Sequence, residues 1–134
     1  EVSIFSEING MKVKCRPDRK TVINGEHFLI DVKKTADTDT FVKSVVNFRY
    51  HVQHPFYSDI YNRLTGHLPR FVFVAIGEKR SIGRHPVRVF ELPQDVVDIG
   101  RATYLEDLES AREYDDFGVG LEIEKLDIPK YLLK

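Results

Sequence analysis

Alternating apolar and charged residues constrain the fold of this chain more than any other feature of its sequence. Over residues 11–16, Met, Val and Cys alternate with two Lys and one Arg, so the two kinds of side chain lie on opposite faces of one strand. Asn9-Gly10 separates this strand from a second candidate strand at residues 1–8. Asn-Gly favours a tight hairpin turn because both residues tolerate positive φ. The chain is therefore expected to begin with a two-stranded β-hairpin.

A third strand is predicted at residues 27–34, after a turn over residues 19–26 with Asn24-Gly25 at its tip. Pro17 ends the second strand because proline has no N–H for the sheet ladder. Three strands in this order predict an antiparallel meander. One face of the third strand carries Phe28, Ile30 and Val32, and the other face carries Leu29, Asp31 and Lys33.

Helices and further strands are predicted after the meander. A helical region is expected over residues 36–65, and Pro55 inside it predicts either a kink or two abutting helices. The apolar run 70–77 predicts a central, buried strand. Another strand over residues 86–92 and a helix over residues 93–114 complete the list. The order β-β-β-α-β-β-α predicts an α/β (α+β) fold with a mixed sheet and helices on at least one face.

The composition predicts one folded domain. The chain has 134 residues, of which 42% are hydrophobic and 31% are charged, and this balance excludes a disordered chain. The lone Cys15 has no partner for an internal disulfide, so a cytoplasmic compartment is expected. We expect one domain over residues 1–134, with residues 115–134 as a tail that packs across the domain or against a partner. Because the first residue is Glu1, a fragment of a longer protein is expected.

Charge is distributed unevenly along the chain, although the net charge is only −1. Residues 1–90 carry 15 Lys and Arg against 9 Asp and Glu, whereas residues 91–127 carry 3 basic and 12 acidic residues. Such asymmetry is typical of a protein with one anion-binding surface. Two ordinary solvated faces would give the same composition.

A candidate metal site lies in the basic part of the chain. Asp31 and Lys33 project from the same face of their strand, and Asp18 leaves the end of the strand expected beside it. Neighbouring strands lie about 4.8 Å apart, so the two carboxylates can converge. They would repel each other unless a cation lay between them. Oxygen ligands without a His or Cys cluster favour Mg²⁺ or Mn²⁺, with the Val32 carbonyl as a further ligand.

This arrangement suits the hydrolysis of a phosphodiester, in which a metal activates water and polarises the phosphoryl oxygen. Lys33 could position the water or stabilise the developing charge. Gln53 and Tyr57 are four residues apart and share one helix face, where they could hold the water, a phosphate oxygen or a base. Tyr50 and Tyr61 extend this stripe, although packing on the sheet explains them better.

Each residue also has a plain structural explanation. An Asp-x-Lys pair is common on strands, and Asp18 after proline could cap a turn. His51, His54 and His85 lack zinc-site spacing and are expected to be surface or DNA-facing residues. The ordered combination of the five candidate residues carries the functional prediction.

The motifs resemble a known family of nucleases. The runs 12–18, 31–35, 49–53 and 56–61 are similar to the nuclease domain of RecE (exonuclease VIII) proteins and, more broadly, to RecB-type members of the PD-(D/E)XK superfamily. The resemblance covers most of the chain and is loose beyond Leu92. It implies a restriction-endonuclease-like core and a Mg²⁺-dependent exonuclease that degrades one strand of duplex DNA from the 5′ end. It also implies a RecT-like annealing protein as a partner, a ring-shaped tetramer, and a bacterial or prophage origin.

The resemblance assigns roles to five side chains. It implies Asp18 and Asp31 as metal ligands assisted by the Val32 carbonyl, Lys33 as the catalytic lysine, and Gln53 with Tyr57 as the Gln-x-x-x-Tyr motif. The family also has an upstream helix with a metal-site His, which this chain is expected to lack. Glu1 or Glu7 is a possible substitute ligand.

Two other functions fit the same residues. A non-catalytic DNA-binding or assembly module could keep the fold after losing the upstream helix. A restriction-like endonuclease could use the same site on internal phosphodiesters.

Overall fold

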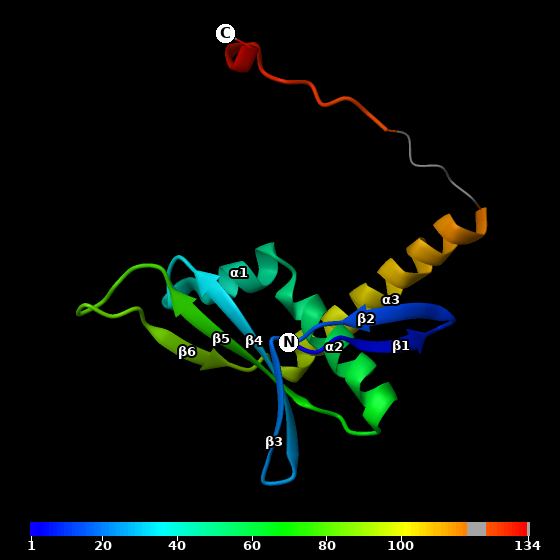
Figure 1. Ribbon diagram of the computed structural model, residues 1–134, viewed down its shortest axis with the longest axis horizontal. Coiled ribbons are helices and arrows are strands. Elements are labelled where there is room, and N and C mark those ends of the chain that lie inside the picture. The colour runs from blue at the N-terminus through cyan, green and yellow to red at the C-terminus, as the bar shows by residue number, and fades with distance from the viewer. Residues whose placement is uncertain (118–122, 134) are drawn as a thin grey trace.

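The computed structural model describes residues 1–117 and 123–133, and most of the described chain forms a mixed α+β domain (Figure 1). A mixed sheet with helices against it confirms the fold class predicted from the sequence. The strands are β1 (Ile4–Ile8), β2 (Met11–Cys15), β3 (Arg19–Ile23), β4 (Glu26–Thr35), β5 (Arg70–Gly77) and β6 (Val87–Phe90). The helices are η1 (Thr38–Thr40), α1 (Phe41–Asn47), α2 (Tyr50–Thr65), α3 (Gln94–Phe117) and η2 (Lys130–Leu133).

The strands form two sheets. β1 and β2 make the predicted hairpin, and Asn9 and Gly10 at its turn have φ values of 50° and 80°. The second sheet has the order β3-β4-β5-β6, in which β4 and β5 are parallel and the other two pairs are antiparallel. Helices α1 and α2 connect the two parallel strands. The predicted central position of β5 is confirmed.

The expected turn over residues 19–26 is wrong in part, because residues 19–23 form strand β3. This strand pairs with β4 across the Asn24-Gly25 turn, so β3 and not β2 is the neighbour of β4. The antiparallel meander predicted from the first three strands is therefore also wrong. The strand lies at a sheet edge, with four of its five residues exposed. It consequently lacks the alternating apolar pattern that identifies a half-buried strand.

The helical region is divided at Phe48–Arg49, where Arg49 adopts a left-handed conformation with φ 57°. Two helices were one of the predicted outcomes, but the junction is not at Pro55, which lies inside α2. Proline cannot donate the helical hydrogen bond to the carbonyl of His51 one turn earlier. Gly100 of α3 lies against this carbonyl so closely that a Cβ there would be 1.8 Å from the His51 oxygen. The two helices therefore meet where one lacks an N–H and the other lacks a side chain.

The core lies between the helices and one face of the sheet. Leu29 of β4 and Phe71 and Phe73 of β5 are fully or almost fully buried there, against Ile60 of α2. The inner face of the β1–β2 hairpin joins the same core, and β1 packs along α2. The positions of Asp31 and Lys33 on the Leu29 face direct them toward α2.

A polar cluster fixes α2 against α3. Arg101 of α3 donates two hydrogen bonds to Asp59 of α2, from Nε at 2.9 Å and Nη2 at 3.1 Å. Tyr104 donates a third hydrogen bond to the same carboxylate at 2.5 Å. Paired, partly buried charges of this kind orient helices, because loss of one partner leaves the other without compensation. The cluster thereby holds the helix that carries Gln53.

The C-terminal part differs from the expectation. Helix α3 continues to Phe117, so the predicted tail at 115–134 begins inside a helix, and residues 118–122 and 134 of that tail lie outside the described residues. In residues 123–133, Ile123, Leu126 and Tyr131 are exposed. Packing of the tail across the domain or against a partner stays a prediction. Among the described helices, none has the length and apolarity needed to cross a membrane.

Candidate active site

Four of the five predicted site residues gather around strand β4. Strand β4 supplies Asp31 and Lys33, helix α2 supplies Gln53, and the link between β2 and β3 supplies Asp18. The Lys33 Nζ atom lies 2.5 Å from Asp31 Oδ2, and Gln53 Nε2 donates a hydrogen bond to Asp31 Oδ1 at 3.2 Å. Asp31 is the centre of the cluster because two of the other three residues contact its carboxylate directly.

Asp18 reaches the cluster by binding the free edge of β4. The pairing of β3 with β4 ends at Arg19 and Ile30, so no strand among the described residues pairs with that side of β4 beyond Ile30. Asp18 Oδ2 accepts a hydrogen bond of 2.7 Å from the backbone N–H of Val32 at this edge. The sequence predicted that Asp18 ends a strand that pairs with β4, whereas Asp18 comes immediately before β3, the strand that does pair with β4. The prediction that Asp18 lies beside β4 is confirmed, but the strand pairing behind it is wrong.

The same edge carries the backbone carbonyl of Val32. In a strand, the N–H and C=O of one residue point to the same side of the ladder. Because the N–H of Val32 bonds to Asp18, its carbonyl also points away from β5. The carbonyl and the two carboxylates therefore lie around one part of the sheet edge.

The carboxyl group of Asp31 is in an unfavourable place for a free anion. Its side chain is only 6% exposed, and burial raises the pKa of Asp31 above its ordinary value. Lys33 and Gln53 act in the opposite direction, while the nearby charge of Asp18 raises the pKa further. The ammonium of Lys33 is close to Oδ2, but no group of the described residues donates a hydrogen bond of regular geometry to this buried atom. A cation beside Oδ2 would relieve both the burial and the repulsion by Asp18.

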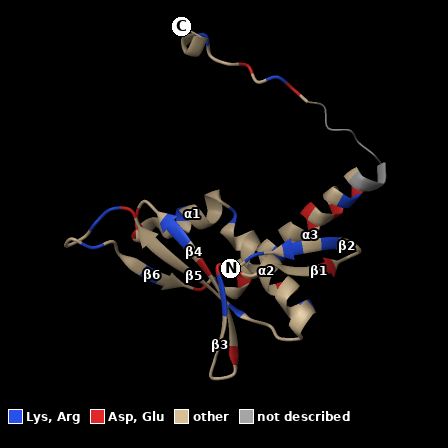
Figure 2. Ribbon diagram, in the orientation of Figure 1, with Lys and Arg blue, Asp and Glu red and all other residues tan. Residues whose placement is uncertain are grey.

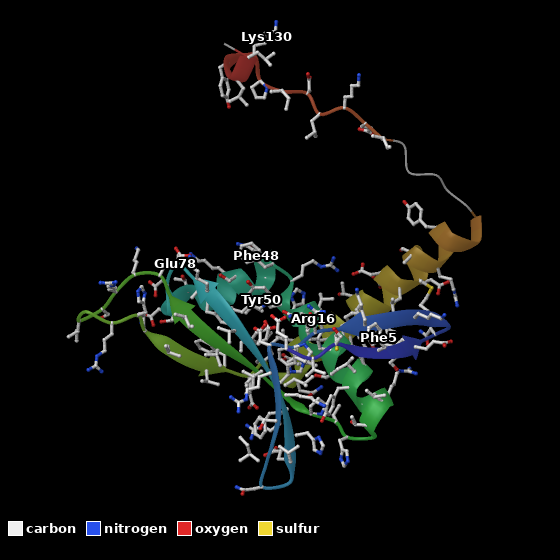
Figure 3. All side chains as sticks on the ribbon, in the orientation of Figure 1. Phe5, Arg16, Phe48, Tyr50, Glu78 and Lys130 are labelled. Atoms are coloured by element: carbon white, nitrogen blue, oxygen red, sulfur yellow. The ribbon has the colours of Figure 1, made fainter. Side chains whose placement is uncertain are left out.

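Lys33 is held by an aromatic ring as well as by Asp31. Its side chain is 18% exposed, and Nζ lies 4.3 Å from the centroid of the Tyr50 ring. Tyr50 in turn stacks on Phe73 of the core, and Figure 3 shows it beside β4. A cation over an aromatic face is attracted by the ring quadrupole. The packing explanation of Tyr50 was therefore incomplete, and its position three residues before Gln53 is the signal that could have identified it.

Tyr57 lies one turn beyond Gln53 on α2, as predicted, but its ring packs at the edge of Phe71 at a centroid distance of 6.1 Å. Within the described residues, no hydrogen bond joins Tyr57 to either carboxylate. Tyr61 is buried and lies 2.5 Å from His27 through its hydroxyl. The structure thus joins Gln53 to the cluster and leaves Tyr57 and Tyr61 in its supporting wall.

The donor set fits a hard divalent cation with few protein ligands. No group of three or more His, Cys, Asp and Glu side chains within the described residues could hold a metal. Two carboxylates and one carbonyl remain, and Asp18 still has Oδ1 free of the hydrogen bond to Val32. Mg²⁺ commonly uses one or two carboxylates and completes its octahedron with water and phosphate oxygens. Glu1 and Glu7, the possible substitute ligands, are exposed, and Glu1 pairs with Arg16 at 3.7 Å.

His54 is not the surface or DNA-facing residue that was expected. Its ring packs on Phe71 at a centroid distance of 4.9 Å, and Nδ1 is buried without a hydrogen-bond partner among the described residues. Burial lowers the pKa of His54 to about 4, and Arg101 acts in the same direction. His85 is exposed, as expected, while His51 is half-buried with Nδ1 3.3 Å from the Val45 carbonyl.

Replacing His54 by phenylalanine should make the stability of the protein less sensitive to acid. Between pH 6.5 and about pH 4 the unfolded chain binds a proton that folded His54 does not, so wild-type stability falls as the pH falls. At pH 5 this loss is about 2 kcal/mol relative to pH 7. Urea unfolding at both pH values should show a smaller difference for His54→Phe than for the wild type. An equal difference would show that His54 is protonated normally in the folded state.

Comparison with known proteins finds a family model and a solved structure that are similar to this chain. The family model of a PDDEXK-like domain of unknown function (DUF3799) matches residues 1–115. The crystal structure of a candidate exonuclease from Eubacterium rectale is similar at a TM-score of 0.68 and 16% sequence identity, which shows a shared fold. The match covers 98% of this chain and 55% of the solved chain, so this chain spans about half the length of that relative. No curated protein matches the chain.

Proposed function

Because this chain belongs to the family of PDDEXK-like domains of unknown function (DUF3799), we propose that it is a nuclease domain that hydrolyses DNA phosphodiesters with Mg²⁺. One observation carries the proposal: Asp18, from the link before β3, is bound to the edge of β4 next to Asp31 and Lys33, which share one face of that strand. Two carboxylates and an amine at one point are the groups that a metal-dependent phosphodiester hydrolase needs.

The residues take distinct roles in this proposal. Asp18, Asp31 and the Val32 carbonyl would hold the ion, which when bound supplies activation of water and polarisation of a phosphoryl oxygen. Lys33 places a positive charge where negative charge develops on the phosphoryl group. Gln53 fixes one oxygen of Asp31 by its hydrogen bond, and this leaves the other oxygen to face the cation. Tyr50 and the buried wall behind it keep Lys33 in place.

The type of nuclease, its direction of degradation and its partners are proposed from resemblance. The solved relative with the same fold is a candidate exonuclease, and the sequence motifs resemble those of RecE-type nucleases. We therefore extend the proposal to an exodeoxyribonuclease that acts on linear duplex DNA in the 5′-to-3′ direction during phage-type recombination. A RecT-like annealing protein, a ring tetramer and a cytoplasmic location belong to the same extension. The family match supports the wider PDDEXK class and does not single out RecE.

Digestion of linear and closed circular duplex DNA should test this proposal. With Mg²⁺ the wild-type protein should degrade the linear form and leave the circle intact, because an exonuclease needs an end. EDTA should stop the reaction, and an Asp98→Asn variant, which removes an exposed carboxylate on α3, should behave as the wild type. Cutting of circles would support the endonuclease instead.

A non-catalytic module is the remaining alternative. Calorimetric titration with Mg²⁺ and with Mn²⁺ separates it from a nuclease, because the module has no need of a metal. Absence of both metal binding at millimolar concentrations and DNA degradation would contradict the proposed nuclease.

A further inference from the structure

We propose that the exposed face of the β1–β2 hairpin binds the DNA strand that enters the active site, with basic side chains on its phosphates and Phe5 stacked on an unpaired base. This inference rests on the proposed nuclease function and adds the residues that receive the substrate.

The hairpin has one buried face and one strongly basic face. Val13 and Cys15 of β2 point into the core, whereas Lys12, Lys14 and Arg16 are exposed. Figure 2 shows the basic residues along β2. Alternate residues of a strand repeat every ~6.7 Å on one face, so the three cations form a row of about 13 Å. A row of this kind can follow the charges of a nucleic-acid backbone.

These cations are largely free to bind an anion. Neither Lys12 nor Lys14 makes an ion pair with any described residue, although Glu7 is the cross-strand neighbour of Lys12. Arg16 donates a hydrogen bond of 3.0 Å from Nε to Ser3, and its contact with Glu1 is a loose 3.7 Å between exposed side chains. The hydrogen bond to Ser3 orients the guanidinium and leaves its other N–H groups available.

An exposed aromatic ring lies within this basic face. Phe5 of β1 is 64% exposed and is the direct cross-strand partner of Lys14. A single exposed phenylalanine is ordinary on a protein surface. Between cations, however, it provides the second element of a single-strand site, since bases stack on aromatic rings while basic groups bind phosphates. Figure 3 shows Phe5 and Arg16 on the same hairpin.

The row of cations leads directly to the proposed metal ligands. Only Pro17 separates Arg16 from Asp18, so their Cα atoms are at most about 7 Å apart. Asp18 is fixed to β4 by its hydrogen bond to Val32. A strand bound along β2 would therefore be delivered to the carboxylates.

Anisotropy measurements with a fluorescein-labelled single-stranded dT20 in EDTA test the hairpin without cleavage. The double variant Lys12→Gln/Lys14→Gln should lower the slope of log K against log salt by about 1.4, since each phosphate contact on a single strand contributes about 0.7. Lys79→Gln/Arg80→Gln, the same charge loss in the exposed loop after β5, should leave the slope unchanged. Equal slopes for the two double variants would overturn the phosphate contacts.

Phe5→Ala should weaken binding of dT20 by about 5- to 150-fold with an unchanged salt slope, which corresponds to the stacking of one base. Because Phe5 is exposed, the variant should fold as the wild type does. Phe5→Leu, which keeps apolar area but removes the aromatic face, should show most of the same loss. A blunt 20-base-pair duplex should lose less affinity. Wild-type affinity in Phe5→Ala, or an equal loss on the duplex, would overturn the stacking. Because no cleavage is measured, failure of the proposed nuclease activity remains distinguishable from failure of this inference.

Discussion

Asp31→Asn should reduce DNA degradation at least about 10³-fold and should remove the binding of Mg²⁺ measured by calorimetry. Asp31 contacts both Lys33 and Gln53 and is the central carboxylate of the candidate site. Asparagine keeps its shape but not its charge, so the proposed cation loses its principal ligand. Loss of activity with full retention of metal binding would contradict the role of Asp31 as a ligand.

The same variant should be at least as stable as the wild type in EDTA. Burial raises the pKa of Asp31 in the folded protein above its value in the unfolded chain. The free energy of unfolding therefore falls as the pH rises and the buried carboxyl group ionises. At neutral pH, asparagine removes both the cost of burying a charge and the repulsion by Asp18. These two gains offset the loss of the ion pair with Lys33. Thermal melting in EDTA should therefore give an equal or higher midpoint, whereas added Mg²⁺ should raise only the wild-type midpoint. A strongly lowered midpoint would show that the ion pair stabilises the fold.

Lys33→Met should lower the rate of degradation by about 10²- to 10³-fold at saturating DNA while metal binding is retained, because a charge at the developing phosphoryl anion acts mainly in the transition state. Methionine preserves most of the side-chain volume over Tyr50. The measurement is the single-turnover rate on a linear duplex with Mg²⁺.

Lys34→Met is the matched control for this variant. Lys34 is the next residue on β4, projects from the opposite face, and has a side chain that is 78% exposed. It should keep the wild-type rate. Equal effects of the two substitutions would indicate a general electrostatic contribution to DNA binding and not a catalytic role of Lys33.

Most of the candidate site could be predicted because its residues follow local rules. The two-residue period of a strand places Asp31 and Lys33 on one face, and the four-residue spacing of a helix places Gln53 and Tyr57 on another. The sequence placed Asp18 near β4 although it predicted the wrong strand pairing. Asp18 lies on the short link between β2 and β3, so it is near β4 whether β2 or β3 pairs with that strand. The substitutions above test the assigned roles.

The parts that could not be predicted depend on tertiary contacts. Strand β3 is an exposed edge strand, so hydrophobic alternation gives no sign of it. The helix junction lies at Arg49, in a left-handed conformation that no sequence rule requires of arginine. The Nδ1 atom of His54 is buried because the ring packs on Phe71 of the sheet once α2 is in place. The contact of Lys33 with Tyr50 likewise exists only after the helix packs on β4.

The close approach of α2 and α3 has a consequence for evolution. Pro55 leaves the His51 carbonyl without its helical donor, and Gly100 is the residue whose missing side chain allows α3 to lie on that oxygen. In a relative with a non-proline residue at position 55, the backbone N–H of that residue binds the carbonyl of residue 51 within α2. The selection for glycine at position 100 of α3 is then weaker. The two positions should therefore covary among homologues, and their joint change would mark lineages in which these helices have moved apart.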